Sequence, residues 1–162
     1  MTVSPADFRK VVGNFATGVT VVTTQTQDGS PYGLTVNSFT SVSLDPILIL
    51  VCLDNRLSGL DVFSENGKFA VNILSEDQKD ICEHFATRGT DRSDADYITG
   101  ETGVPVLNGA LARLECEVTA IHPGGDHKVL IGEVKSAEVA PGRENEAPLL
   151  FFRGGYHQLS AS

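Results

Sequence analysis

The spacing of apolar and polar residues predicts a chain of about seven strands with two or three short helices. Runs rich in β-branched or apolar residues predict strands over 19–24, 32–37, 47–53, 69–74, 112–120, 129–139 and 149–152. The run 47–53 is almost continuously apolar, which is typical of a strand buried on both faces.

The run 112–120 alternates instead, as a half-buried antiparallel strand does. Its apolar side chains share one face and its polar side chains the other: Leu114, Cys116 and Val118 against Arg113, Glu115, Glu117 and Thr119.

The first helix and the first turn have clear local signals. Ser4 has the residue type of an N-cap and Pro5 that of the first helical position, so we expect a helix that runs to about Asn14. The sequence Asp-Gly-Ser-Pro at 28–31 predicts a hairpin turn between the first two strands.

Two more helices are expected in the middle of the chain. One covers 57–65 and ends near Asn66-Gly67. Ser75 and Gln78 have capping-box spacing, which predicts a helix that starts there and continues through Phe85. The polar, glycine-rich segment 87–103 predicts an exposed loop.

Most of the connections between these elements are too short for helical crossovers between parallel strands. A mainly β fold follows: an antiparallel barrel or sandwich with helices at its rim. A chain of 162 residues predicts a single domain over 1–162.

The charge of the chain limits the kinds of partner and ligand that we expect it to bind. The formal net charge of −9 argues against nucleic acid, because affinity for a phosphate backbone comes from Lys and Arg. An anionic ligand would therefore need local donors such as hydroxyls, backbone N–H groups and a placed Arg or Lys.

Features that the sequence lacks indicate the location of the protein and the redox state of its thiols. The segment 1–9 has no apolar signal-peptide core, and no apolar run approaches the ~20 residues of a membrane span. Three cysteines, Cys52, Cys82 and Cys116, form no CxxC pair. We expect a cytoplasmic protein with reduced thiols and no membrane partner.

Familiar catalytic motifs do not occur in the sequence. It has no Walker loop, GxGxxG fingerprint, HExxH helix or GxSxG elbow. The four histidines are scattered without the spacing of a metal site, so we expect no metal.

Two clusters nevertheless contain side chains that could bind a ligand. The segment 33–46 carries a row of hydroxyl and amide side chains that suits a polar, planar, phosphorylated ligand. In Gly124-Gly125-Asp126-His127, two glycines permit a close backbone approach beside a histidine. From composition alone, an ordinary edge strand and a hairpin turn with a surface histidine explain these clusters as well.

Five segments in register resemble the short-chain flavin reductase family, whose fold is the FMN-binding split barrel, a Greek-key-like antiparallel barrel. The similarity spans about 8–158. The matching segments are 15–24, 33–46, 69–74 with Phe85-Ala86 after it, 125–127 and 148–156.

The resemblance implies a set of site residues. Flavin ring and ribityl contacts fall on Thr35, Val36, Asn37, Ser38, Ser41, Val42 and Ser43. Two loops on the phosphate side are implied at Leu53, Asp54, Asn55 and Ser58, and at Phe85, Ala86, Thr87 and Arg88. His127 is implied beside the nicotinamide as the catalytic histidine, with Arg153, Gly154 and Tyr156 closing the nicotinamide pocket.

The chain departs from the family pattern at two positions in the first phosphate loop. Asn55 stands where many relatives have Lys, and Leu57 where Ser is frequent. We therefore expect the phosphate to depend more on Arg88 and on backbone donors.

The resemblance also implies the reaction: hydride transfer from NADH or NADPH to FMN or FAD. Reduced flavin would then diffuse to a separate flavin-dependent monooxygenase, and the reductase would be a homodimer with its flavin site near the subunit interface. Two alternatives stay open: a split-barrel oxidoreductase with tightly held FMN and another acceptor, and a flavin-binding module without activity.

Overall fold

A computed structural model describes residues 2–57, 60–87 and 89–159 of the chain. Over these residues the fold is mainly β, as the sequence predicted, and every strand pairing is antiparallel. The strands are β1 (Thr17–Gly18), β2 (Thr20–Gln25), β3 (Pro31–Val36), β4 (Thr40–Leu44), β5 (Ile47–Asp54), β6 (Lys68–Ile73), β7 (Tyr97–Thr99), β8 (Pro105–Leu107), β9 (Ala112–Gly124), β10 (His127–Val139), β11 (Leu150–Phe152) and β12 (Gly155–His157). The helices are α1 (Pro5–Val12), α2 (Asp61–Asn66) and α3 (Lys79–Ala86).

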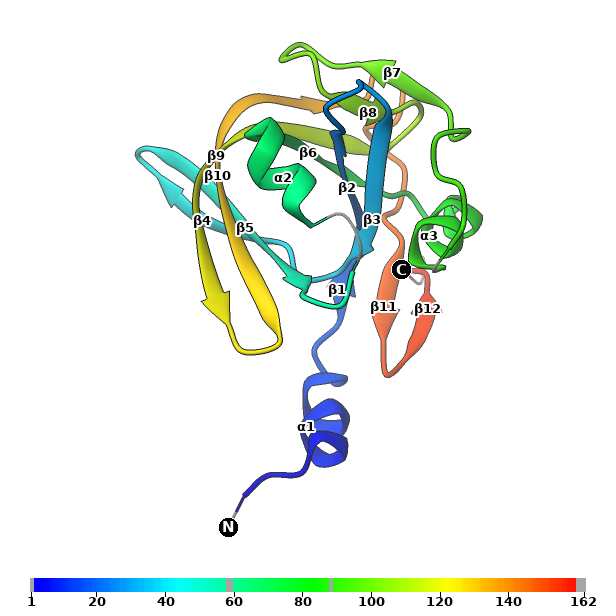
Figure 1. The fold of residues 1–162 in the computed structure, drawn as a ribbon. Helices are drawn as coiled ribbons and strands as arrows, with labels where there is room; N and C mark the ends of the chain where they lie inside the picture. Colours follow the sequence, from blue (N-terminus) through cyan, green and yellow to red (C-terminus); the bar gives the residue numbers. More distant parts are fainter. Residues whose placement is uncertain (1, 58–59, 88, 160–162) are drawn as a thin grey trace.

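The main sheet has seven strands in the order β3-β2-β6-β9-β10-β5-β4 (Figure 1). A second sheet, β1-β11-β12, joins the start of the chain to its end, and β7 pairs with β8. Outside the ladder, the Ser38 hydroxyl donates to the Cys52 carbonyl and accepts from the Cys52 N–H, both at 2.9 Å. This side chain ties the segment after β3 to β5, which is not its neighbour in the sheet order.

Two buried clusters hold the strands and helices together. The larger includes Val22, Val51, Phe63, Phe69, Val71, Cys116 and Leu130, and the smaller includes Val19, Val21, Leu74, Cys82, Phe85, Leu107 and Leu149. No helix among the described residues is long and apolar enough to cross a membrane.

The prediction that strand 47–53 is buried on both faces is wrong. Only every second side chain of β5 is fully buried, at Ile49, Val51 and Leu53, whereas Leu48, Leu50 and Cys52 on the opposite face are only partly buried. The reason is that β5 lies in an antiparallel sheet between β4 and β10, so only its inward face meets the core.

The alternation in β9 is present, but Glu115 on its polar face is only 1% exposed. Its carboxylate accepts hydrogen bonds from the N–H groups of Glu101 (2.9 Å) and Thr102 (2.6 Å) and from the Thr102 hydroxyl (2.6 Å). The segment predicted to be an exposed loop supplies these donors because β7 pairs with β8 and brings 100–103 onto β9. A hydrogen-bonded partner is what makes a buried carboxylate tolerable.

Helix ends match the predictions only in part: α1 ends at Val12 instead of about Asn14, and α2 begins at Asp61 instead of 57. The Ser4 hydroxyl caps α1 by accepting from the Asp7 N–H at 3.1 Å, and α2 ends at Gly67 in the left-handed region (φ 70°). The capping box forms only in part: the Gln78 side chain accepts from the Ser75 N–H at 3.0 Å, but the Ser75 hydroxyl bonds Asp77, and α3 begins at Lys79.

The first helix projects away from the sheets, and none of its side chains is buried (Figure 1). Its connection to the body is made beyond its end, where the Arg153 N–H donates to the Gly13 carbonyl at 2.9 Å. The β11–β12 turn therefore contacts the chain just after the end of α1.

Packing at Gly132 in β10 offers a test of the core. A Cβ at this position would lie 2.5 Å from the Phe69 ring and 2.9 Å from the Cys116 Cβ, both fully buried. We expect Gly132→Ala to lower the free energy of unfolding by ~1–3 kcal/mol through overpacking. Urea unfolding measures this, with Gly18→Ala as the control because nothing lies within 4 Å of its added Cβ. Equal stabilities of the two variants would contradict this account of the core.

Candidate functional site

The hydroxyl-rich segment after β2 is held in place by its own side chains. The Thr35 hydroxyl donates to the Cys82 carbonyl of α3 at 2.7 Å, and the Val36 carbonyl accepts from the Thr20 hydroxyl at 2.9 Å. With Ser38 bonded to Cys52, these groups fix the end of β3 between α3 and β5. Their first role is therefore to set the backbone course of the segment.

A cavity of about 180 Å³ lies beside this segment. We call it the Tyr156 cavity; Val19, Thr35, Val36, Asn37, Cys82, Phe151 and Tyr156 line it. The structure thus brings three predicted flavin-contacting residues together with a predicted nicotinamide-pocket residue from the other end of the chain.

Cys82 and Tyr156 form the neutral wall of this cavity. The Cys82 sulfur and the Tyr156 hydroxyl oxygen are hydrogen-bonded at 3.2 Å. This hydrogen bond, with burial second, raises the pKa of Tyr156 to about 12, and burial raises the pKa of the Cys82 thiol. Both groups are uncharged at neutral pH. Cys82 was not among the predicted site residues, because a single thiol in a helix carries no sequence signal for a site.

A second cavity of about 400 Å³ adjoins the first. We call it the Asn37 cavity, and it shares Asn37 and Phe151 with the Tyr156 cavity. Its other lining residues are Arg9, Val12, Gly13, Phe15, Thr17 and Gly154. The Thr17 hydroxyl oxygen is buried there with no hydrogen-bond partner among the described residues.

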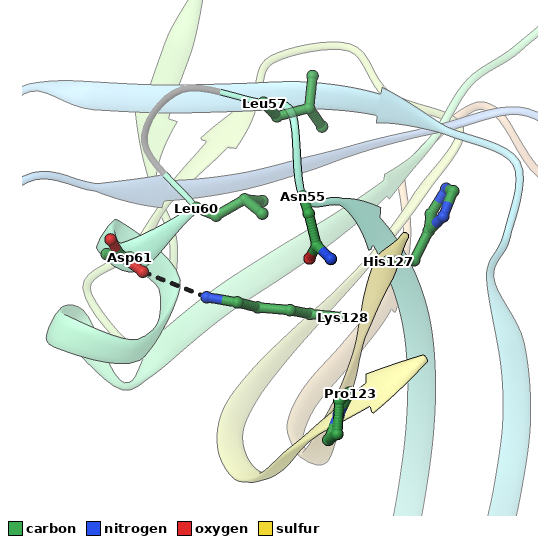
Figure 2. Close-up of a pocket in the computed structure, with 7 residues that line it drawn as sticks. All are labelled: Asn55, Leu57, Leu60, Asp61, Pro123, His127 and Lys128. Atoms are coloured by element: carbon green, nitrogen blue, oxygen red, sulfur yellow. Dashed lines mark hydrogen bonds and ion pairs between the residues drawn. The ribbon is translucent and has the colours of Figure 1, made fainter. Parts of the chain in front are cut away.

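His127 lies in a different cavity, of about 320 Å³, lined by Asn55, Leu57, Leu60, Asp61, Pro123, His127 and Lys128 (Figure 2). Its Nδ1 is 2.7 Å from an Asp126 carboxylate oxygen, and this contact lowers the pKa of Asp126. Lys128 extends from β10 in another direction and meets Asp61 at 3.2 Å (Figure 2).

The first predicted phosphate loop packs against the glycine turn that precedes His127. The Asn55 N–H donates to the Asp126 carbonyl at 2.9 Å, and the Asn55 side chain donates to the Gly125 carbonyl at 3.3 Å. Asp54 forms an ion pair with Arg56, whose Nη2 lies 2.6 Å from the Asp54 carboxylate. The hydrogen bonds from Arg56 hold the pKa of Asp54 well below its usual range. Arg56 and Lys128 are cations of this region that the resemblance did not single out.

Several predicted site residues have other environments. The side chains of Leu53 and Phe85 are buried in the two core clusters, so a ligand would meet these residues only through their backbone. The Thr87 hydroxyl donates to the Glu83 carbonyl at 2.8 Å at the end of α3, next to exposed Ala86. Ser58 and Arg88 lie outside the described residues.

The remaining predicted flavin contacts lie on edge strand β4. Exposed Ser41 pairs with Ile49, Val42 occupies a bulge and is half exposed, and the Ser43 hydroxyl accepts from the Asp45 N–H at 3.2 Å.

Arg153 and Gly154 form the turn between β11 and β12. Both residues have positive φ, 49° and 80°. The Arg153 guanidinium donates through Nε (2.9 Å) and Nη2 (2.7 Å) to the Asn14 side-chain oxygen, and it stacks on the Phe152 ring at 4.9 Å. Gly154 of this turn lines the Asn37 cavity together with Arg9 and Val12 of α1.

Comparison with known proteins identifies the family of this chain. The model of the flavin reductase like domain matches residues 12–160. The chain is 39% identical to the reductase subunit HsaB of a flavin-dependent monooxygenase from Mycobacterium tuberculosis, over 95% of this chain and 82% of the relative. It is 44% identical to the FMN reductase (NADH) SmoA of Agrobacterium fabrum, over 94% and 85%.

Solved structures show the same fold. The flavin reductase PheA2 superposes with a TM-score of 0.89 at 40% identity, covering 98% of this chain and all of that one. The NADH:FAD oxidoreductase SgcE6 of Streptomyces globisporus, solved with NAD and FAD fragments, gives a TM-score of 0.88 at 37% identity over 99% and 97%. The predicted split-barrel fold is therefore confirmed, and the chain belongs to the flavin reductase like family.

Proposed function

We propose that this protein is an NADH-dependent flavin reductase that reduces FMN, with FAD as the alternative flavin, and releases it to a separate flavin-dependent monooxygenase. One observation carries the proposal. Thr35, Val36 and Asn37 share the Tyr156 cavity with Tyr156, although the segments lie at opposite ends of the chain. Relatives described as FMN reductase (NADH) and NADH-dependent flavin reductase support the choice of donor.

The lining of the joined cavities fits a flavin. Val19, Val36 and Phe151 offer apolar surface to a flat ring, while Thr35 and Asn37 lie at its polar edge. The buried Thr17 hydroxyl in the adjoining cavity still needs a hydrogen-bond partner, which a polar ring edge or ribityl hydroxyl would supply.

When bound, the flavin supplies the redox chemistry by accepting a hydride from reduced nicotinamide. The chain's own residues bind the flavin, orient it and shield it from water. Asn37 and the backbone of 35–38 would hold the flavin's polar edge, and Phe151 would exclude water beside it. Neutral Cys82 and Tyr156 add no competing charge, which suits a hydride transfer that needs positioning more than a strong acid or base.

NADH oxidation tests the function. Protein freed of small molecules by gel filtration should be colourless and should oxidise NADH only when FMN or FAD is added. A yellow protein that reduces another acceptor would indicate tightly held FMN. FMN binding without NADH oxidation would establish a binding module and overturn the proposal.

His127 is proposed to position the nicotinamide. We expect His127→Ala to lower kcat/KM for NADH about tenfold, equal to ~1.4 kcal/mol, with FMN binding nearly intact. His122→Ala is the matched control, because exposed His122 lies across from Val129 on the neighbouring strand. Unchanged kinetics of His127→Ala would make His127 a turn residue.

We also propose a homodimer with the flavin site near the subunit interface. His127 and Tyr156 line cavities that share no residue within one chain, so a second subunit gives a way to bring them together. Apolar side chains are exposed on two surfaces: Phe8, Val11 and Phe15 at α1, and Val42, Leu44 and Ile47 at the β4–β5 corner. Leu44 is 90% exposed.

The three free cysteines agree with a reducing cytoplasm, where we place the protein.

Light scattering checks the homodimer. The wild-type protein should have about twice the 17.3 kDa chain mass, because pairing removes these apolar side chains from water. Phe8→Asp combined with Leu44→Asp should shift the mass toward 17.3 kDa. The control Val139→Asp changes an equally apolar, exposed residue at the far end of β10 and should leave the dimer intact. A wild-type monomer at micromolar concentration would overturn this proposal.

A further inference from the structure

Cys82 of α3 connects two sides of the Tyr156 cavity. Its carbonyl oxygen accepts a hydrogen bond from the Thr35 hydroxyl at 2.7 Å, and its sulfur is hydrogen-bonded to the Tyr156 hydroxyl oxygen at 3.2 Å. Thr35 belongs to β3 of the seven-stranded sheet, whereas Tyr156 belongs to β12 of the three-stranded sheet. All three residues line the cavity. One helical residue therefore sets the distance between walls that come from different sheets.

The Tyr156 side chain depends on this contact for its position. Among the described strands, β12 pairs only with β11, and it has three residues. The Tyr156 ring meets the Phe151 ring with centroids 5.6 Å apart, and the Lys79 ammonium lies 5.6 Å from its centroid. Neither ring contact directs the hydroxyl, whose one hydrogen-bond partner within the described part of the chain is Cys82.

Cys82 is the fixed partner of the pair. Its side chain is fully buried in the smaller core cluster, and its N–H donates to the Gln78 carbonyl at 3.1 Å at the start of α3. One turn later, Phe85 packs so closely on Gly33 of β3 that an added Cβ there would lie 2.6 Å from its ring. These contacts hold α3 against β3, so Cys82 stays in place and Tyr156 adjusts to it.

A thiol suits this position because it meets two requirements. It packs as a small apolar side chain, which the core cluster needs, and it still offers Tyr156 a weak hydrogen bond. The bond joins two neutral groups, since burial raises the pKa of the Cys82 thiol and the bond to Cys82 raises the pKa of Tyr156 to about 12. Alanine would fill much of the same space but would leave the Tyr156 hydroxyl without its partner.

We propose that Cys82 is a positioning residue for the flavin: through the Tyr156 hydroxyl, it holds the Tyr156 ring where the cavity stays open to a flat ring. This inference rests on the proposed function, which gives this cavity to the flavin. Cys82 acts through Tyr156 and need not touch the flavin.

The expected size of the effect follows from the populations of Tyr156. The cavity of about 180 Å³ is present with the hydrogen bond formed. Without the bond, the side chain can occupy other staggered rotamers, and only part of the molecules keep the cavity open. The apparent affinity for flavin then falls in proportion to that fraction. We expect the Kd to rise about fivefold, equal to ~1 kcal/mol, which is typical of one neutral hydrogen bond.

A double-mutant cycle tests the proposal. Cys82→Ala and Tyr156→Phe each remove one partner of the bond, and the double variant removes both. Cys82→Ser retains a hydrogen-bonding group. Cys116→Ala is the matched control, because Cys116 is equally buried but belongs to the larger core cluster and does not line the cavity. Fluorescence titration without NADH gives the Kd for FMN and for riboflavin, which has the ring but no phosphate, and urea unfolding measures stability.

Each of the two single variants that remove the bond should raise the Kd for FMN and for riboflavin about fivefold. The double variant should show the same fivefold rise, since both changes break one bond. Cys82→Ser should bind flavin nearly as the wild type does. Cys116→Ala should lower the free energy of unfolding and leave the Kd unchanged.

Three outcomes would overturn the inference. An unchanged Kd in Cys82→Ala or in Tyr156→Phe would show that the bond has no role in flavin binding. A rise of about 25-fold in the double variant would show that the two residues act independently. A Cys82→Ser variant as weak as Cys82→Ala would assign the effect to packing. If Cys82→Ala fails to fold, Tyr156→Phe tests the same bond at a partly buried side chain.

Binding measured without NADH keeps this inference separate from the proposed function. If the cycle shows the expected coupling but the wild-type protein oxidises no NADH with any flavin, the reductase proposal fails and the role of Cys82 stands. If the wild-type protein oxidises NADH but the cycle shows no coupling, the role of Cys82 fails and the reductase proposal stands.

Discussion

The close contact between Gly33 of β3 and Phe85 of α3 is the constraint on which the candidate site depends. A Cβ at Gly33 would lie 2.6 Å from the Phe85 ring, so only glycine lets the helix approach the strand this closely. The approach brings the Cys82 carbonyl within 2.7 Å of the Thr35 hydroxyl. Cys82 thereby faces Tyr156, and the Tyr156 cavity gains its neutral wall. Phe85, whose side chain is buried, thus positions the site from within the core.

A second constraint is electrostatic. A protein with a formal charge of −9 repels nucleotides on average, so nucleotide recognition depends on where its few cations lie. Most of the described cations are neutralised by carboxylates, and Arg9, Lys10 and Arg153 are the group that lines a common cavity.

Segments near both ends of the chain help to line the Tyr156 and Asn37 cavities. Strand β1 pairs with β11, and α1 meets the β11–β12 turn through Gly13, Asn14 and Arg153. His127, by contrast, lies in the cavity formed with the Asn55 loop. Dimer formation and nicotinamide positioning are therefore linked questions in this fold, because the proposed nicotinamide contacts occupy separate cavities of one subunit.

The sequence by itself determined the local elements and pointed to two of the segments that line the Tyr156 cavity. Ser4 and Pro5 start α1, the turn at 28–31 joins β2 to β3, and Thr35 and Asn37 after Gly33 line the Tyr156 cavity. These features depend on residues close in the chain, or on motifs whose order is visible in the sequence. The family resemblance placed Arg153, Gly154 and Tyr156 near that segment for the same reason.

Only the tertiary structure decided which side chains are buried and which distant residues meet. It buried Glu115 under the 100–103 segment, left one face of β5 only partly buried, and turned Leu53 and Phe85 into the core. It also placed Cys82 on Tyr156 and Arg153 on Asn14, residues 74 and 139 positions apart. Alternation along a strand shows which residues share a face, but what covers that face depends on segments far away in the chain, and no local pattern encodes that pairing.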